Sequence, residues 1–332
     1  MYLPFQDIHK LIETGQVDAD LPISDAQIQP ASMDLRLGTK AYRVRSSFLP
    51  GHKTTVATKL AELALYEIDL RQSAVLETGC VYVIPLMERL ALASDITAIA
   101  NPKSSTGRLD VLVRVIADGC RNFDQTPRGY CGALYLEVCP QTFPVRVRSG
   151  SRLVQLRWRT PAGKSGCPSS CALSVELENE GIVGYRAKNY ARCVIDMDKE
   201  GAYAIRDFWE PVFAPERCVI LDPGRFYIFA SKQTVRVPSN FVAELAPFNP
   251  RMGEFRLHYA GFFDPGFGAE ESRAVLEVRS HTVPFLLEDG QDMGYLDHAH
   301  LTEPSARPYG ARVGSHYQGQ GLRLSKHFTF PE

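Results

Sequence analysis

The pattern of apolar and polar positions changes soon after the N-terminus. Phe5, Ile8, Leu11 and Ile12 fall on one helical face and Gly15 follows as a stop, so the sequence predicts a short amphipathic helix. Beyond it, apolar residues come in short runs rich in β-branched and aromatic side chains, which is typical of strands. Such runs cover residues 81–84, 109–116, 133–138 and 226–229. Because long helical periodicity is scarce, we expect a mainly β protein, built as a sandwich or barrel of the jelly-roll kind.

Several short motifs occur twice in the same order. Leu-Glu-Thr-Gly, a polar segment and Leu-Glu-Val in the first half have counterparts in the second half. The first set lies at residues 76–79, 102–108 and 136–138, and the second at residues 221–224, 250–253 and 276–278. A repeat unit of this size is a whole domain rather than a solenoid module. Residues 161–170 between the copies are rich in turn formers, so we expect two tandem domains, residues 1–165 and 171–332.

Charge and cysteine usage narrow the class of protein. The formal net charge is −1, with 37 basic and 38 acidic residues, so we expect no nucleic-acid or membrane partner held by broad electrostatics. No apolar run approaches the roughly 18 residues of a membrane span, and the N-terminus lacks a secretion signal, which predicts a cytoplasmic protein. The eight cysteines are scattered through apolar contexts and predict buried, reduced thiols.

The motifs of two common nucleotide-active sites are missing. Zinc deaminases need His-x-Glu and Pro-Cys-x-x-Cys, and neither occurs here. Cys167 and Cys171 have the wrong spacing for a zinc pair, and His298 and His300 lack a third ligand nearby, so a linker turn and a solvated loop are the simpler interpretations. Residues 163–165 are similar to the end of a P-loop, but Trp158 stands where the earlier glycine is required.

The polar segment at residues 103–108 combines two hydroxyls, a glycine and two cations. Hydroxyls, freed backbone N–H groups and cations together are suited to a phosphate chain. A polar turn between strands uses the same residue types, so the segment alone does not decide between the two.

Glu137 and Glu277 each lie inside an apolar strand pattern. A carboxylate removed from water costs several kcal/mol unless it is paired or used in chemistry. A solvent-facing position on a half-buried strand would explain either glutamate alone, but the recurrence of Leu-Glu-Val in both halves argues against it. A buried glutamate with a raised pKa would suit general acid–base work near neutral pH.

Several separated segments occur in an order that resembles a known family. They are Ser-Ser-x-Gly-Arg at 104–108, the hairpin at 260–268, Val-Leu-Glu at 275–277, the early segment at 30–38 and the C-terminal run at 308–320. Their combination resembles the dCTP deaminase branch of the dUTPase superfamily, and the tandem arrangement is similar to its long bacterial form. The resemblance implies two dUTPase-like domains, each a distorted jelly-roll or β-barrel, after the short N-terminal helix.

The same resemblance implies a hydrolase that converts dCTP into dUTP and ammonia. A serine hydroxyl and a backbone carbonyl would hold water near C4 of the cytosine ring, while a glutamate takes its proton and passes one to N3. The catalytic residues carried over are Glu277 or Glu137, Ser104 and Ala260. The nucleotide-binding residues carried over are Lys103, Ser105, Arg108 and Gln155 at the phosphates, Asp264 at the deoxyribose, and Tyr309, His316 and Gln320 in a closing tail.

The resemblance also implies ligands and partners, and this sequence differs from the family pattern at several positions. Mg²⁺ would arrive with the triphosphate, no zinc is expected, dTTP is a candidate inhibitor, and we expect a homo-oligomer. Lys103 stands where the family usually has arginine, and His316 stands where lysine is common. The first half breaks the Asp-Pro-Gly hairpin into residues 123–129, and the second half lacks Ser-Ser-x-Gly-Arg.

These losses are complementary, so one composite site per pair of repeats is our leading hypothesis. The first half would supply the phosphate motif, and the second half would supply the hairpin, the tail and Glu277 as proton shuttle. The rival is a site that uses Glu137, with the second half as a scaffold. Two other functions stay open: a dUTP diphosphatase or bifunctional dUMP-forming enzyme, and a non-catalytic nucleotide-binding regulator.

Overall fold

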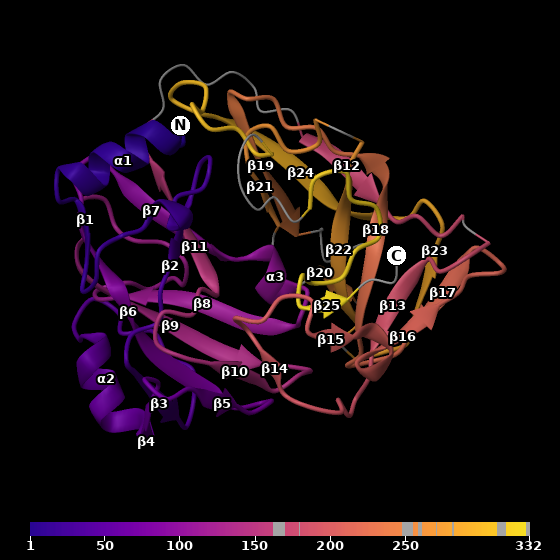
Figure 1. The fold of residues 1–332 in the computed structure, drawn as a ribbon, viewed down its shortest axis with the longest axis horizontal. Coiled ribbons are helices and arrows are strands. Elements are labelled where there is room, and N and C mark those ends of the chain that lie inside the picture. Colours follow the sequence, from indigo (N-terminus) through magenta and orange to yellow (C-terminus); the bar gives the residue numbers. More distant parts are fainter. Residues whose placement is uncertain are drawn as a thin grey trace.

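The computed structural model describes residues 1–161, 170–178, 180–247, 255–257, 261–269, 271–280, 282–310 and 317–329. The expected mainly β fold is confirmed, and residues 1–161 form most of one side of the molecule in Figure 1 while the later residues form the other. We call these two parts the first half and the second half.

Three sheets are built mainly from the first half. The largest contains β4 (Ala64–Asp69), β3 (Lys40–Val44), β6 (Val81–Ala91), β9 (Cys131–Pro140) and β8 (Val111–Ala117) in that order, with β1 (Val17–Ala19) also paired to β6. The second contains β2 (Met33–Leu35), β11 (Val154–Arg159) and β7 (Thr97–Pro102). The third contains β5 (Ala74–Leu76), β10 (Val145–Val147) and β14 (Ile195–Asp196), so a strand from the second half completes it.

The second half forms two larger sheets and two ribbons. The five-stranded sheet contains β16 (Trp209–Val212), β13 (Gly184–Ala187), β18 (Phe226–Thr234), β22 (Arg273–Ser280) and β20 (Phe255–Leu257). The four-stranded sheet contains β12 (Ser170–Ser174), β24 (Asp292–His300), β19 (Phe241–Pro247) and β21 (Phe262–Phe263). The ribbons pair β15 (Tyr203–Ala204) with β25 (Phe328–Thr329), and β17 (Cys218–Leu221) with β23 (Phe285–Glu288).

Helices are short and few among the described residues. The predicted N-terminal helix is confirmed as α1 (Phe5–Glu13), which buries Ile8 and Leu11. The sequence did not indicate α2 (Val56–Leu63), whose N-terminus is capped by the Thr55 side chain, because its apolar pattern is too short to stand out. The remaining helical elements are α3 (Ser104–Gly107), η1 (Asp25–Gln27) and η2 (Ile205–Asp207). No helix in the described ranges is long and apolar enough to span a membrane.

The two halves share buried contacts. The main core of the first half also takes in Trp209, Phe226 and Phe328 of the second half. A separate core lies within the second half, around Phe229 and Leu276. Figure 1 shows α3 at the junction between the halves, and the site described below lies there. Packing of this kind fixes side chains from distant parts of the sequence against one another.

Three sequence expectations need correction. Seven cysteines lie in the described residues and are free, but Cys131, Cys171 and Cys193 are exposed rather than buried. Cys171 lies in strand β12 instead of a linker turn, because the strand begins at Ser170. His298 and His300 lie in β24 rather than a solvated loop, and both rings contact Phe241 across the sheet.

Candidate active site

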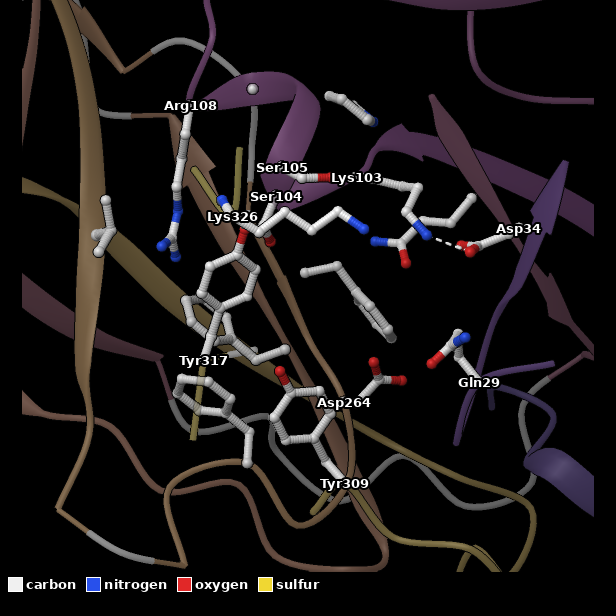
Figure 2. Close-up of a pocket in the computed structure, with 18 of the residues that line it drawn as sticks. Gln29, Asp34, Lys103, Ser104, Ser105, Arg108, Asp264, Tyr309, Tyr317 and Lys326 are labelled. Atoms are coloured by element: carbon white, nitrogen blue, oxygen red, sulfur yellow. Dashed lines mark hydrogen bonds and ion pairs between the residues drawn. The ribbon is translucent and has the colours of Figure 1, made fainter. Parts of the chain in front are cut away.

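A cavity of about 280 Å³ lies between the two halves beside α3 (Figure 2). Most of the residues that the sequence predicts for the site line this cavity. They are Lys103, Ser104, Ser105, Arg108, Gln155, Asp264, Glu277, Tyr309 and Gln320. Glu137 does not line it, and Ala260 and His316 fall outside the described residues. Residues more than a hundred positions apart in the sequence therefore meet at one cavity.

The polar segment of the first half is a short helix rather than a turn. Strand β7 ends at Pro102, and the carbonyl of Lys103 then accepts hydrogen bonds from the N–H groups of Thr106 and Gly107 at 2.8 and 3.0 Å. This single turn, α3, points the Ser104 and Ser105 side chains and the Lys103 stem toward the cavity in Figure 2. All three of these residues line the cavity.

Glu277 is placed by the alternation of strand β22. Ala274, Leu276 and Val278 pack into the core of the second half, so the intervening residues point to the opposite face, toward the first half. On that face the Glu277 carboxyl is buried, with 7% of the residue exposed. A Cβ atom added at Gly107 would lie 2.5 Å from Glu277 Oε2, so only glycine lets the carboxyl rest against α3.

The environment of Glu277 favours its neutral form. Burial raises the pKa of Glu277 well above its usual range, the nearby Arg108 guanidinium opposes that rise, and Asp110 adds to it. Glu277 Oε2 has no hydrogen-bond partner among the described residues. A buried carboxyl with an oxygen left over in a cavity can accept or donate a proton at neutral pH.

Arg108 lies beside the C-terminal segment rather than among the other cations. Its guanidinium donates to Gln320 Oε1 at 3.0 Å and to the Arg323 carbonyl at 3.1 Å, and it stacks over the Tyr317 ring at 3.9 Å. Burial lowers the pKa of Arg108. Figure 2 shows Arg108 on one side of the cavity and the pair formed by Lys103 and Asp34 on the other.

The opposite side of the cavity carries a cation-rich cluster. The Lys103 ammonium pairs with the Asp34 carboxylate, and Arg152 Nη1 lies 3.7 Å from Asp34 Oδ2. Burial lowers the pKa of Lys103, and the positive charges of Arg152 and Lys326 lower it further, while Asp34 opposes both effects. Gln155 faces this cavity from β11 and accepts a hydrogen bond from Ser32 Oγ at 3.1 Å. Two basic side chains thus flank one buried carboxylate, and Gln155 lies on the strand paired beside it.

The turn after β21 forms another wall. Phe267 N–H donates to the Asp264 carbonyl at 3.1 Å, and Gly266 adopts a φ of 89°, which L side chains rarely adopt. Asp264 Oδ1 accepts a hydrogen bond at 3.2 Å from the backbone N–H of Ala31, in the first half. Burial raises the pKa of Asp264 to about 7. Tyr309 packs beside this turn, with its ring 5.6 Å from that of Phe267.

The C-terminal segment is packed against the body of the protein. Tyr317 and Gln320 are buried on Arg108, and Leu324 and Phe328 belong to the main core. Closure of this segment over bound nucleotide stays a prediction from the sequence. Burial of the Leu324 and Phe328 side chains in the core stabilises the packing of this segment on the rest of the protein.

Glu137 occupies a different environment. It lies in β9 opposite Arg114 of β8, and Arg114 Nε donates to Glu137 Oε1 at 2.9 Å. The Arg114 guanidinium in turn covers the Phe123 ring at 3.7 Å. Glu137 is therefore a buried carboxylate with a cationic partner, whereas Glu277 is a buried carboxyl that faces a cavity.

Several lining residues escaped the sequence analysis. Asp34 carries the same signal as the two glutamates, a carboxylate within the short apolar strand β2, and could have been found that way. Lys326 and Glu200 line the cavity too, but nothing in their local sequence indicates it, since only the return of the chain brings them there. Within the described ranges, no three His, Cys, Asp or Glu side chains gather as a metal ion would require.

Comparison with known proteins identifies the family to which this fold belongs. Residues 2–162 match the model of the 2'-deoxycytidine 5'-triphosphate deaminase N-terminal domain, and residues 151–328 match that of its C-terminal domain. A crystal structure of 2'-deoxycytidine 5'-triphosphate deaminase from Agrobacterium tumefaciens is similar, with a TM-score of 0.86 and 49% identity over 91% of this chain and 98% of that one. The chain belongs to the 2'-deoxycytidine 5'-triphosphate deaminase family.

Curated relatives resemble a shorter part of the chain. The dUMP-forming dCTP deaminase of Beutenbergia cavernae is 34% identical over 109 residues, and that of Bifidobacterium longum is 35% identical over 111 residues. Each alignment covers 32% of this chain and 56% of the relative, so the chain spans little more than half the length of the curated relatives it matches.

Proposed function

We propose that this chain deaminates dCTP hydrolytically, giving dUTP and ammonia, in the cavity between its two halves. The observation that carries the proposal is Glu277, a buried carboxyl of raised pKa that faces the cavity against the helix bearing Ser104. A phosphatase acting on the triphosphate alone needs no proton shuttle in such a place. A non-catalytic binding protein would have no use for a buried carboxyl of raised pKa that faces its cavity, whereas Glu137, whose Oε2 is also unpartnered among the described residues, is paired with Arg114.

The chemistry assigned to Glu277 is a proton transfer between water and the ring. The neutral Glu277 carboxyl gives its proton to N3, and the resulting carboxylate takes a proton from water as the water oxygen bonds to C4. The tetrahedral intermediate then collapses to a C4 carbonyl as the C4–N4 bond breaks and a proton moves to N4, so that ammonia leaves. Ser104 on α3 orients the water, and the Ala260 carbonyl is its proposed second acceptor. Arg108, which opposes the rise in the pKa of Glu277, helps to stabilise the ionised carboxylate after it gives up its proton.

The other side of the cavity is assigned to the triphosphate. Lys103 and Arg152 supply positive charge there, and Ser105 and Gln155 supply further polar groups. Asp264 and Tyr309 form the wall assigned to the sugar. Mg²⁺ is proposed to enter with the triphosphate, and no metal is assigned to the reacting carbon. Inhibition by dTTP, assembly into a homo-oligomer and a cytoplasmic location remain predictions from the sequence.

A second candidate is the bifunctional reaction that releases dUMP. It is favoured by the names of the curated relatives, which are dUMP-forming dCTP deaminases, although the alignments cover about a third of this chain. The Agrobacterium protein, which matches more of this chain, is named a 2'-deoxycytidine 5'-triphosphate deaminase, and that name does not specify the nucleotide released.

One assay separates these candidates. The purified chain is given dCTP with Mg²⁺, or dUTP with Mg²⁺, and ammonia and pyrophosphate are followed together. Ammonia from dCTP without pyrophosphate supports the leading proposal, and ammonia with an equal amount of pyrophosphate supports the bifunctional one. Pyrophosphate from dUTP with no ammonia from dCTP would identify a diphosphatase. Binding of dCTP with neither product would leave a nucleotide-binding protein and contradict both proposals.

A further inference from the structure

Lys326 reaches the cavity from the last segment of the chain, far in sequence from the polar segment of α3. Its side chain is about one-fifth exposed, and Figure 2 shows it crossing the cavity toward the side that holds Lys103 and Asp34. The charge of Lys326 is among those that lower the pKa of Lys103, after the larger effect of burial. Lys326 is therefore electrostatically part of the same cation-rich cluster.

The backbone around Lys326 is held on two sides. The Lys326 carbonyl accepts from Gly201 N–H at 3.0 Å, and β25 then pairs in parallel with β15. One residue earlier, Ser325 Oγ donates to the Ser105 carbonyl in α3 at 2.8 Å. These bonds tie the position of Lys326 directly to α3, so the ammonium is presented by a fixed backbone rather than by a loose terminus.

The present partner of Lys326 can leave, whereas that of Lys103 cannot. Lys326 Nζ lies 2.6 Å from Glu200 Oε1, and the Glu200 side chain is 53% exposed. Asp34, the partner of Lys103, is 2% exposed at its side chain and has no access to water as an alternative. An exposed carboxylate regains its hydration when an ion pair opens, so exposed pairs contribute little net stability. Glu200 can therefore yield its place to another anion.

We propose that Lys326 is a phosphate-binding residue of this cavity and that Glu200 holds its ammonium until the phosphates of the nucleotide replace the carboxylate. The assignment rests on the proposed function for the identity of the ligand. It adds a third cation to Lys103 and Arg152, and it makes release of Glu200 a step of substrate binding. Exchange of one anion for another keeps the ammonium paired throughout, which avoids leaving a partly buried charge without a partner.

The test measures binding without turnover, using inorganic triphosphate and Mg²⁺ as the probe in titration calorimetry. Lys326→Met removes the charge and keeps the apolar stem, and we expect it to weaken binding about tenfold, the loss of one charge-assisted contact. Lys326→Arg should retain binding within about threefold. Glu200→Gln should tighten binding about twofold because the competing carboxylate is gone. Opposite effects at the two positions distinguish exchange from a structural ion pair.

A matched control pair lies on α2. Lys59 and Glu62 are joined at 2.8 Å and have similar exposures, 29% and 52%, but neither lines the cavity. Lys59→Met and Glu62→Gln should leave triphosphate affinity unchanged. Thermal unfolding of all variants verifies that each is folded, and binding of deoxycytidine should be the same in each.

Three results would overturn the inference. Triphosphate affinity could be unchanged in Lys326→Met, or Glu200→Gln could weaken binding as much as Lys326→Met does. The wild-type chain could also fail to bind triphosphate, while release of ammonia from dCTP decides the proposed function separately. If binding depends on Lys326 as expected but dCTP yields no ammonia, the phosphate assignment stands and deamination is wrong.

Discussion

The two strand glutamates show how neighbours decide the chemistry of a residue. Glu137 and Glu277 occupy similar Leu-Glu-Val contexts, and both are almost fully buried. Arg114 neutralises the first by direct hydrogen bonding, whereas the second faces a cavity and its pKa is raised. The first arrangement suits a structural role, and the second suits the proton transfer that we propose for Glu277.

Substituting each glutamate by glutamine should separate these roles. Glu277→Gln is expected to lower kcat for dCTP by several orders of magnitude with little change in Kd, because the amide cannot carry the proton. Glu137→Gln is expected to retain kcat but lose roughly 2 kcal/mol of stability, since the partly exposed Arg114 loses its buried counterion. Steady-state kinetics and denaturant unfolding of both variants measure this, and the reverse ranking would favour the rival site built on Glu137.

Asp264 gives a pH dependence of stability with a definite sign. Its pKa is about 7 in the folded chain against an ordinary value of 3.8, so between these values the folded state binds more protons than the unfolded state. Stability is then lost as pH rises through this window, and Glu277 contributes in the same direction. Asp264→Asn removes the contribution of Asp264 to this pH dependence of stability, while the amide oxygen can still accept a hydrogen bond from the Ala31 N–H.

We therefore expect the gain in unfolding temperature of Asp264→Asn over the wild type to grow from about pH 5 to about pH 8. Asp69→Asn is the control, because Asp69 is exposed and its Arg71 partner lowers its pKa instead. A gain that is constant with pH would show that Asp264 is not the titrating group.

At the scale of elements, helix α3 and strand β22 meet so closely that one methyl group matters. Gly107 has a helical backbone that other residues could also adopt. Glycine is needed there because a larger side chain would collide with Glu277. Gly107→Ala would place a Cβ against the Glu277 carboxyl and move it from its position on the cavity wall. We expect a loss of about a hundredfold in kcat/KM with little change in unfolding temperature, as displacement of a reacting group by about an ångström produces.

Gly321→Ala is the control for this substitution, since a Cβ added there meets open space. Equal activity of Gly107→Ala and the wild type would mean that Glu277 does not need its contact with α3.

Sequence pattern predicted some of these elements and missed others for physical reasons. The alternation in β22 and β9 places each glutamate on the opposite face of its strand from its apolar neighbours. It does not show which residues pack against that face, because this depends on tertiary packing. The polar run at 103–108 could not be distinguished from a turn because a four-residue helix has no periodicity to detect. Asp34 was detectable as a charge in an apolar strand, whereas Lys326 and Glu200 were not.

At the scale of the whole molecule, the cavity needs both halves. The first half supplies α3, Asp34 and Arg152, and the second half supplies Glu277, the turn at Asp264 and the C-terminal segment. Ion pairs between the halves include Arg279 with Asp110, and Arg157 Nη2 with Glu244 Oε1 at 2.9 Å. These ion pairs and the shared apolar core fix the distance between the groups assigned to the base and those assigned to the phosphates.

Because one chain carries both halves, formation of the cavity should not depend on protein concentration. When a cavity is shared between separate subunits, dilution below their dissociation constant removes it, whereas two walls joined by one chain face each other at a fixed effective concentration. Specific activity per chain should therefore stay constant from micromolar to low nanomolar protein, with freshly diluted and equilibrated samples agreeing. A fall in specific activity on dilution, followed by its recovery on concentrating the same sample, would mean that a second copy contributes to the working site.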